Sequence, residues 1–182
     1  GNFDKAIDVL RKKGQKVAAK RADRDAKEGV VLAISSSDTK SGAIICLNCE
    51  TDFVAKNANF IELAKSILVL ALESNCTSLQ DVKELNFDTS MTINDKLVEQ
   101  TGVIGEKIEL SNYSIIQADY VATYIHPGNK LGSLLGFNMH FDGIYEIGKN
   151  IAMQIAAMNP LGLRETDISQ EIVDKEMEIG KD

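Results

Sequence analysis

Two cysteines three residues apart, Cys46 and Cys49, are the first feature of the sequence that suggests chemistry. Two thiolates at this spacing can begin a tetrahedral zinc site. The sequence has no second such pair, and its only histidines are His126 and His140. Both cysteines also fall in an apolar run typical of a strand, in which residues three apart point to opposite faces. We therefore interpret them as buried strand cysteines and expect neither a metal nor another cofactor.

Other patterns that would indicate nucleotide binding or catalysis are incomplete. The glycines within residues 102–107 and 128–136 match neither a P-loop nor a dinucleotide-binding fingerprint. No arrangement of nucleophile, base and orienting group is visible in the sequence. His126 precedes Pro127 in a predicted turn, and we interpret it as a surface residue. We expect a protein that binds another molecule and is not an enzyme.

The segment Glu50–Lys56 (E-T-D-F-V-A-K) is the strongest candidate for a functional site. It connects a predicted buried strand to a predicted buried helix, where a short polar connector would be sufficient. Instead it places Asp52 beside the bulky aromatic ring of Phe53. In one interpretation Phe53 packs into the local core and Asp52 caps a turn. In the other the segment protrudes, inserts Phe53 into a partner protein and supplies charge from Asp52.

Composition and charge limit the class of partner. The chain has 182 residues, of which 44% are hydrophobic, so it can bury a real core. Residues 1–29 hold nine Lys/Arg against five Asp/Glu, whereas the rest of the chain is acidic enough to give a net charge of −7. An acidic body does not favour a phosphate backbone, and the basic run lacks interleaved aromatic residues for base stacking. We expect a protein partner and no direct contact with nucleic acid.

The sequence also indicates a location. The longest apolar run, Ile61–Leu72, is interrupted by polar residues, so we expect no contact with a membrane. An odd number of cysteines (Cys46, Cys49 and Cys76) argues against a disulfide scaffold and favours a reducing, cytoplasmic setting. Residues Gly1–Asp4 lack the features of a signal peptide, and we expect them to follow a cut inside a longer sequence.

Hydrophobic periodicity predicts the N-terminal elements. Phe3, Ile7 and Leu10 favour a helix that Gly14 ends. Residues 15–28 are rich in Ala, Lys and Arg with almost no large apolar side chains. We interpret them as an exposed linker helix or tether.

Strands and helices alternate in the next part of the chain. Strands are expected at residues 30–34 and 43–49, and the apolar character of the second favours a central position. Asn59 with Glu62 predicts the start of a buried helix that continues to about Leu72. Two capping boxes predict two further short helices: Ser78 with Asp81, and Thr92 with Asp95.

Three strands and a helix are expected in the second half of the chain. The strands are predicted at residues 107–116, 120–126 and 131–138, and the helix at about 142–158. The helix has large residues on one stripe (Ile144, Ile147, Ile151, Ile155 and Met158) beside a ridge of small ones (Gly148, Ala152 and Ala156), and the ridge would let another element pack closely. The order strand, turn, strand, helix therefore occurs twice, through duplication or coincidence.

These elements together predict an α+β fold. We expect antiparallel sheets with helices packed on one face, preceded by a helical linker. A last amphipathic segment is expected at residues 169–179.

Several blocks of the sequence resemble the bacterial translation elongation factor Ts family. Residues 46–56 (C-L-N-C-E-T-D-F-V-A-K) are similar to the family signature N-C-x-T-D-F-V-A. Residues 104–108 (I-G-E-K-I) resemble its I-G-E-N-I segment, and residues 124–135 its Y-x-H…x-G-V-L-V hairpin. Residues 6–22 resemble the end of its N-terminal helical module with the linker, and residues 151–160 its second core helix. The blocks follow the family's order and cover most of the chain.

The resemblance implies an organisation in three regions. Residues 1–28 would be the remnant of the N-terminal helical module plus the linker helix. Residues 29–140 would form the first core subdomain, of the dimerisation type, and residues 141–182 the start of the second. The family's T-G-A-G contact motif and its coiled coil have no counterpart in the sequence, so we expect a truncated core.

The resemblance also implies a function, which is guanine nucleotide exchange on elongation factor Tu during translation. In the family, the residues that match Asp52 and Phe53 reach beside the nucleotide site of the GTPase, wedge its helices apart and displace Mg²⁺. Thr51 and Val54 belong to the same motif. Gln154 stands where the family often has a histidine and is a further candidate contact. The alternative is a non-catalytic fragment that binds the GTPase, or itself as a homodimer, with little exchange activity.

Overall fold

The computed structural model describes residues 3–180, apart from the side chains of residues 3–8, 10 and 11. The predicted apolar stripe of Phe3, Ile7 and Leu10 therefore lies outside the described side chains. The α-helices in this range are α1 (Phe3–Arg21), α2 (Asp52–Ala55), α3 (Ala58–Glu73), α4 (Leu79–Glu84), α5 (Ile93–Ile104), α6 (Ile144–Met158) and α7 (Gln170–Ile179). The strands are β1 (Glu28–Ser35), β2 (Ser41–Cys49), β3 (Glu109–Gln117), β4 (Tyr120–Ile125) and β5 (Gly132–Phe137), and a short 3₁₀ helix covers Glu165–Asp167.

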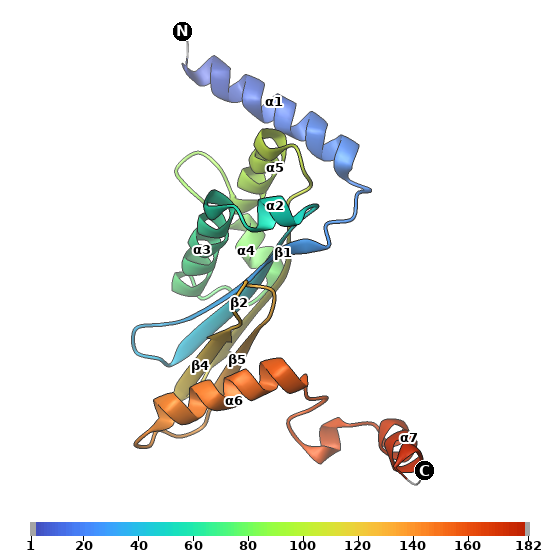
Figure 1. Ribbon diagram of the computed structural model, residues 1–182. Helices are drawn as coiled ribbons and strands as arrows, with labels where there is room; N and C mark the ends of the chain where they lie inside the picture. Colours follow the sequence, from blue (N-terminus) through green and yellow to red (C-terminus); the bar gives the residue numbers. More distant parts are fainter. Residues whose placement is uncertain (1–2, 181–182) are drawn as a thin grey trace.

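The strands form two antiparallel sheets, one ordered β1-β2-β3 and the other the hairpin β4-β5 (Figure 1). β2 occupies the centre of the larger sheet, as its apolar sequence predicts. Its burial alternates along the strand, because successive side chains point to opposite faces. The predicted α+β fold is confirmed.

The main hydrophobic core lies between the larger sheet and helices α3, α4 and α5. β2 contributes Ala43, Ile45 and Leu47, which are at most 1% exposed. Ile67 and Leu68 of α3 are fully buried against them. This core is the support on which the loops between β2, α3 and α5 are built.

The β4–β5 hairpin packs against the other face of the larger sheet. A Cβ on Gly42 of β2 would lie only 2.6 Å from Cγ1 of Val121, so this contact needs a glycine. Helix α6 covers the opposite side of the hairpin, where it contacts Tyr120 and Ala122 (Figure 1). Each sheet thus carries its helices on one face, as predicted.

The start of α3 differs from the sequence prediction. Its N-cap is Asn57, whose side-chain oxygen accepts a hydrogen bond from the Asn59 N–H at 2.9 Å. The prediction of a start at Asn59 with Glu62 is therefore wrong by two residues. Asn57 takes the cap because it follows Lys56, the C-cap of α2, and has an extended backbone. Both predicted capping boxes, which start α4 and α5, are confirmed.

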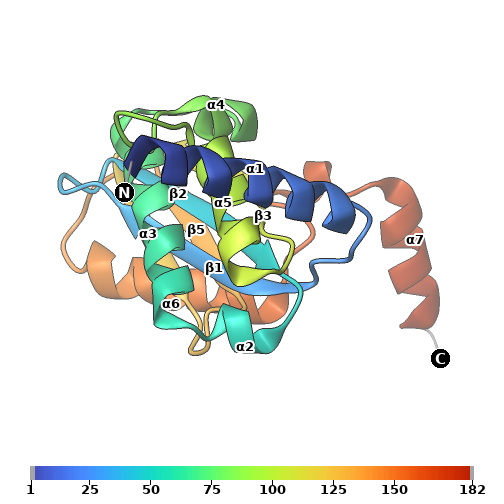
Figure 2. The ribbon, with the colours of Figure 1, turned by 90° about the horizontal axis from the view of Figure 1, so that it is seen from above.

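Helix α1 passes through Gly14 without a break, so the prediction that Gly14 ends a helix is wrong. Gly14 is buried where α1 crosses α5, and the two helices lie across each other in Figure 2. A Cβ on Gly102 of α5 would come within 2.5 Å of the Gly14 Cα. Close packing, and not a helix stop, explains the glycine. The exposed helix predicted from residue 15 onward is confirmed as far as Arg21, where these residues continue α1 and their side chains are exposed or half-buried.

Helix α6 packs on the hairpin through small residues. Its buried positions are Ile144, Gly148, Ala152 and Ala156. The small-residue ridge is therefore confirmed as the packing surface. Of the large apolar stripe beside it, Ile144 is buried, whereas Ile147, Ile151 and Met158 are exposed. A Cβ on Gly148 would lie 3.0 Å from the Ala122 Cβ, which leaves no room for large side chains. The regional boundaries after residues 28 and 140 stay predictions.

Replacement of Gly102 with Val is expected to push α1 away from α5, because the added side chain overlaps the Gly14 backbone. Overpacked contacts typically cost about 1–3 kcal/mol of stability. We expect a loss in that range in urea denaturation, together with faster amide exchange in α1. The control Ala19→Val places the same side chain at an exposed position of α1 and should cost about 0.7 kcal/mol or less. Equal losses in both variants would contradict the close crossing.

Candidate functional site

The segment Glu50–Lys56 begins directly after the end of β2 and contains the four-residue helix α2. Ala55 is 3% exposed and anchors the helix in the main core. Phe53 points the other way, and its residue surface is 83% exposed. Of the two interpretations of this segment, the geometry matches the protruding one, because the ring does not pack into the local core.

Phe53 borders a largely apolar cavity of about 340 Å³ between α2, the start of α3 and the end of α5. Val54 and Phe60 line it from α2 and α3, and Val103 and Ile104 line it from α5. Val103 is itself 65% exposed. The aromatic ring therefore stands at the edge of an apolar surface. Exposed apolar groups gathered in this way are typical of sites that bind another protein.

Asp52, the neighbour of Phe53, forms an ion pair with Lys56 one helical turn later, at 2.6 Å. The hydrogen bond from the Lys56 ammonium lowers the pKa of the Asp52 carboxyl. Asp52 is therefore negatively charged at neutral pH. The site combines a fixed negative charge with an exposed aromatic ring.

Glu106 connects α2 to the turn that follows α5. Its Oε2 accepts hydrogen bonds from the backbone N–H groups of Glu50 at 3.1 Å and Thr51 at 3.0 Å. Its Oε1 accepts from the Thr51 hydroxyl at 2.6 Å. Thr51 is the N-cap of α2 and also accepts a long hydrogen bond from the Val54 N–H. The start of α2 is thus held by a residue 55 positions away in the sequence.

Glu50 makes the reverse connection. Its Oε1 accepts a hydrogen bond from the Lys107 backbone N–H at 2.6 Å, and both of its oxygens accept from Arg21 of α1 at 2.7 and 2.8 Å. Its side chain is only 16% exposed. The Lys107 N–H, and after it the Arg21 guanidinium, lowers the pKa of the Glu50 carboxyl. Three segments, the ends of α1 and β2 and the turn before β3, therefore meet at this carboxylate.

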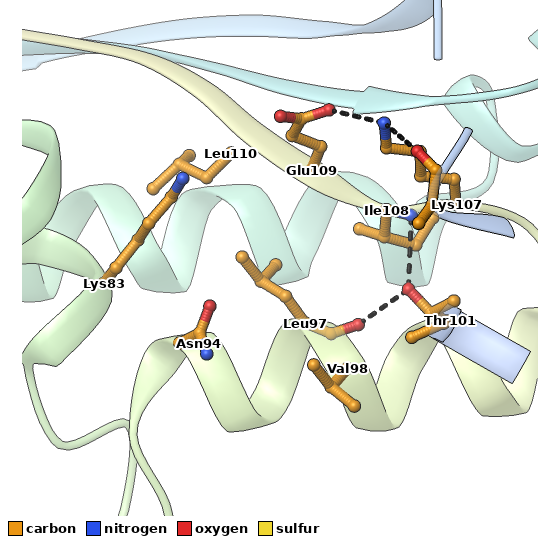
Figure 3. A pocket seen from close by; sticks show the side chains of 11 residues that line it. Lys83, Asn94, Leu97, Val98, Thr101, Lys107, Ile108, Glu109 and Leu110 are labelled. Atoms are coloured by element: carbon orange, nitrogen blue, oxygen red, sulfur yellow. Dashed lines mark hydrogen bonds and ion pairs between the residues drawn. The ribbon is translucent and has the colours of Figure 1, made fainter. Parts of the chain in front are cut away.

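The turn before β3 is itself fixed by α5, as Figure 3 shows. The hydroxyl of Thr101 accepts a hydrogen bond from the Ile108 N–H at 3.2 Å and donates to the Leu97 carbonyl at 3.0 Å. The Lys107 ammonium pairs with Glu109 at 3.3 Å in the same view and donates to the carbonyl at residue 22. The residues that make these contacts line a cavity of about 240 Å³ beside the turn. Glu106 therefore extends from a rigid support.

The cysteine pair takes the arrangement expected of strand residues. Cys49 is buried in the main core, whereas Cys46 is half-buried on the opposite face beside Asn48. Burial raises the pKa of the Cys49 thiol to about 11. Among the side chains that the structure describes, no group of three or more could hold a metal ion. The expected lack of a cofactor stays a prediction.

The remaining predicted site residues fall in two places. Asp52 and Val54 lie with Phe53 on α2, Thr51 is the N-cap of this helix, and Val54 is partly buried against the main core. Gln154 is exposed on α6, a helix separate from α2 that packs on the β4–β5 hairpin. The structure therefore brings four of the five residues together and leaves Gln154 apart.

Comparison with known proteins identifies the family. The model of the family Elongation factor TS matches residues 50–182. The chain belongs to the elongation factor Ts family. It is 50% identical to Elongation factor Ts of Christiangramia forsetii over all 182 residues, which cover 65% of that relative. The proteins of the same name from Flavobacterium psychrophilum and Porphyromonas gingivalis are 47% and 44% identical, again over the whole chain and 65% of the relative.

Membership confirms the resemblance drawn from residues 46–56 and places the chain among translation elongation factors. The chain spans 65% of the length of these relatives. No helix in the described part of the chain is both long and apolar enough to cross a membrane.

Sequence reasoning missed the supporting role of Arg21, Glu50 and Glu106, because their contacts join segments far apart in the chain. Glu50 lies in the segment that the sequence singled out, but no role was assigned to it there. For Glu106 the signal was the I-G-E-K-I block at residues 104–108, which resembles a family segment. That block was interpreted only as a resemblance.

The lowered pKa of Glu50 predicts an acid-dependent contribution to stability. A carboxyl whose pKa is lowered by folding stabilises the protein above its unfolded value of 4.5 and loses this effect as the pH falls through the folded value. At pH 7, Glu50→Gln should be less stable than the parent chain by about 1–2 kcal/mol. The difference should shrink as the pH falls below 4.5, measured by urea denaturation at each pH.

Glu62→Gln is the matched control, because Glu62 is exposed on α3. It should change stability by no more than about 0.5 kcal/mol at any pH. If the loss in Glu50→Gln stayed constant down to pH 3, the carboxylate would not be the source of the stabilisation.

Proposed function

We propose that the chain promotes release of GDP from the GTPase elongation factor Tu, by inserting Phe53 beside the nucleotide site and disturbing the bound Mg²⁺. In this proposal the protein performs no covalent chemistry. Thr51, Asp52, Phe53 and Val54 form the contact, and Gln154 is a further candidate contact. Membership in the family supports the proposal, and so does the outward orientation of Phe53.

The exposure of Phe53 is the observation that carries this proposal. A large aromatic ring in water forgoes the gain from burial, which is about 1.5–3 kcal/mol for a phenylalanine side chain. The structure around it does bury a phenylalanine, because Phe60 of α3 is only 2% exposed. The ring therefore remains available for a pocket on a partner, where buried aromatic residues typically dominate the binding energy.

The negative charge of Asp52 fits the second part of the mechanism. Mg²⁺ in GTPases bridges phosphate oxygens and protein oxygens, so its displacement weakens nucleotide binding. A carboxylate brought near this ion changes the electrostatic balance around it and the phosphates. Each 1.4 kcal/mol of lost nucleotide affinity raises the dissociation constant about tenfold.

Thermodynamic linkage makes such a factor recyclable. If the factor weakens nucleotide binding to the GTPase, the nucleotide must weaken binding of the factor by the same ratio. Entry of a new nucleotide then releases the factor. No covalent step is needed at any point in this cycle.

A second candidate function is binding of the GTPase, or of a second copy of the chain, without acceleration of GDP release. The exposed apolar side chains of Ile147, Ile151 and Met158 on α6 favour such an association.

Phe53→Ala should reduce the acceleration of GDP release by about 30-fold or more, because it truncates the aromatic anchor of the contact. The measurement is the release rate of fluorescent GDP from loaded elongation factor Tu, with the parent chain and the variant at several concentrations. Leu163→Ala is the control, because Leu163 is also 83% exposed but lies outside α2. It should leave the release rate within about twofold of the parent.

The same experiment separates the two candidates. Equal acceleration by the parent chain and Phe53→Ala would contradict the wedge mechanism. Binding of the loaded GTPase by the parent chain without faster GDP release would support the second candidate instead.

A further inference from the structure

We propose that Glu106 is a positioning residue, which holds α2 in the orientation that presents Phe53 to the partner. This inference rests on the proposed exchange function. It adds a residue that touches neither partner nor nucleotide, but determines whether the aromatic ring is already in place before binding.

Helix α2 is too short to be stable without contacts to the rest of the protein. It has four residues, and isolated helices shorter than about 12–15 residues are marginal in water. Ala55 is the one residue of α2 that is fully buried. One small anchor fixes the depth of the helix but leaves its first turn, which carries Asp52 and Phe53, to be held by other contacts.

The Glu106 carboxylate supplies these contacts. It accepts from the Glu50 and Thr51 N–H groups and from the Thr51 hydroxyl, at 3.1, 3.0 and 2.6 Å. All three donors belong to the two residues before Asp52. Hydrogen bonds to a charged acceptor are roughly twice as strong as neutral ones, so the carboxylate is the dominant restraint on this turn.

Glu106 is held firmly enough to act as a support. Gly105 before it ends α5 in the left-handed conformation, with φ of 82°. Ile108 after it is tied to the buried Thr101 of α5. Lys107 between them is tied to Glu50 and to the end of α1. The carboxylate therefore couples α2 to α5 and to the larger sheet.

Positioning of this kind affects binding through entropy. A loop already held in its bound orientation loses less conformational freedom when the partner is engaged. Without the carboxylate, the Thr51 N-cap would lose a hydrogen-bond acceptor and two N–H groups would lose their partner. Phe53 would then sample several orientations, and only a fraction of the molecules would be ready to bind.

The test uses Glu106→Ala and Glu106→Gln in the 182-residue chain. Glu106→Ala removes all three hydrogen bonds and should lower the acceleration of GDP release by about tenfold or more. Glu106→Gln keeps one carbonyl acceptor and an amide that can face the Thr51 hydroxyl, so it should recover part of the loss. The control Glu73→Ala removes an exposed carboxylate at the C-terminal end of α3, outside the site and its support, and should behave like the parent.

Two readouts distinguish positioning from general destabilisation. Amide exchange should speed up selectively at Thr51–Ala55 in Glu106→Ala, with the main core unchanged. In a double-mutant cycle, Glu106→Ala should have little further effect on GDP release when Phe53 is already Ala, because Glu106 acts through that ring. Additive losses, or uniformly faster exchange over the whole chain, would overturn the positioning role.

The outcomes also separate this inference from the proposed function. If Phe53→Ala slows GDP release and Glu106→Ala does not, the exchange function stands and the positioning role fails. If neither the parent chain nor any variant accelerates release, both proposals fail as statements about exchange. Amide exchange at α2 then decides only whether Glu106 orders the helix.

Discussion

Two carboxylates, Glu50 and Glu106, each accept hydrogen bonds from the backbone of the segment that carries the other. These reciprocal hydrogen bonds join the end of β2 to the turn before β3. Arg21 connects the end of α1 to the same contact. Each carboxylate would be costly to place there alone, because partly buried charges need several donors to offset lost hydration. Here each carboxylate accepts hydrogen bonds from backbone N–H groups of the segment that carries the other. The orientation of α2, and with it the exposed ring of Phe53, depends on this reciprocal contact.

The site is therefore a short helix placed on a rigid support. Four residues of helix present a charge and an aromatic ring, while α5 and the larger sheet behind them are fixed by a buried core. The arrangement resembles many binding loops, in which function is carried by a short segment and precision by its scaffold. The exposed Val103 and the cavity beside Phe53 extend the same surface onto α5. A partner that receives the ring would meet this surface as well.

Close approach of backbones organises the rest of the molecule. Gly14 and Gly102 let α1 cross α5, Gly42 lets the hairpin settle on the larger sheet, and Gly148 lets α6 settle on the hairpin. On α6 this contact leaves the large apolar residues Ile147 and Ile151 facing outward. Small residues thus decide which face of an element is buried, because dispersion contacts are strongest where the two surfaces approach most closely.

The sequence alone determined the α+β class, the central place of β2, two helix caps and the family, because these depend on local periodicity and short motifs. It also singled out Asp52 and Phe53 by residue type, although both orientations of the ring were compatible with it. Tertiary structure decided that Phe53 faces solvent, that Gly14 lies inside a helix crossing and that α6 buries its small ridge. It also brought Glu106 to Thr51, across 55 positions of chain. These features depend on which surfaces meet in three dimensions, and a pattern of neighbouring residues carries no information about partners so distant in the sequence.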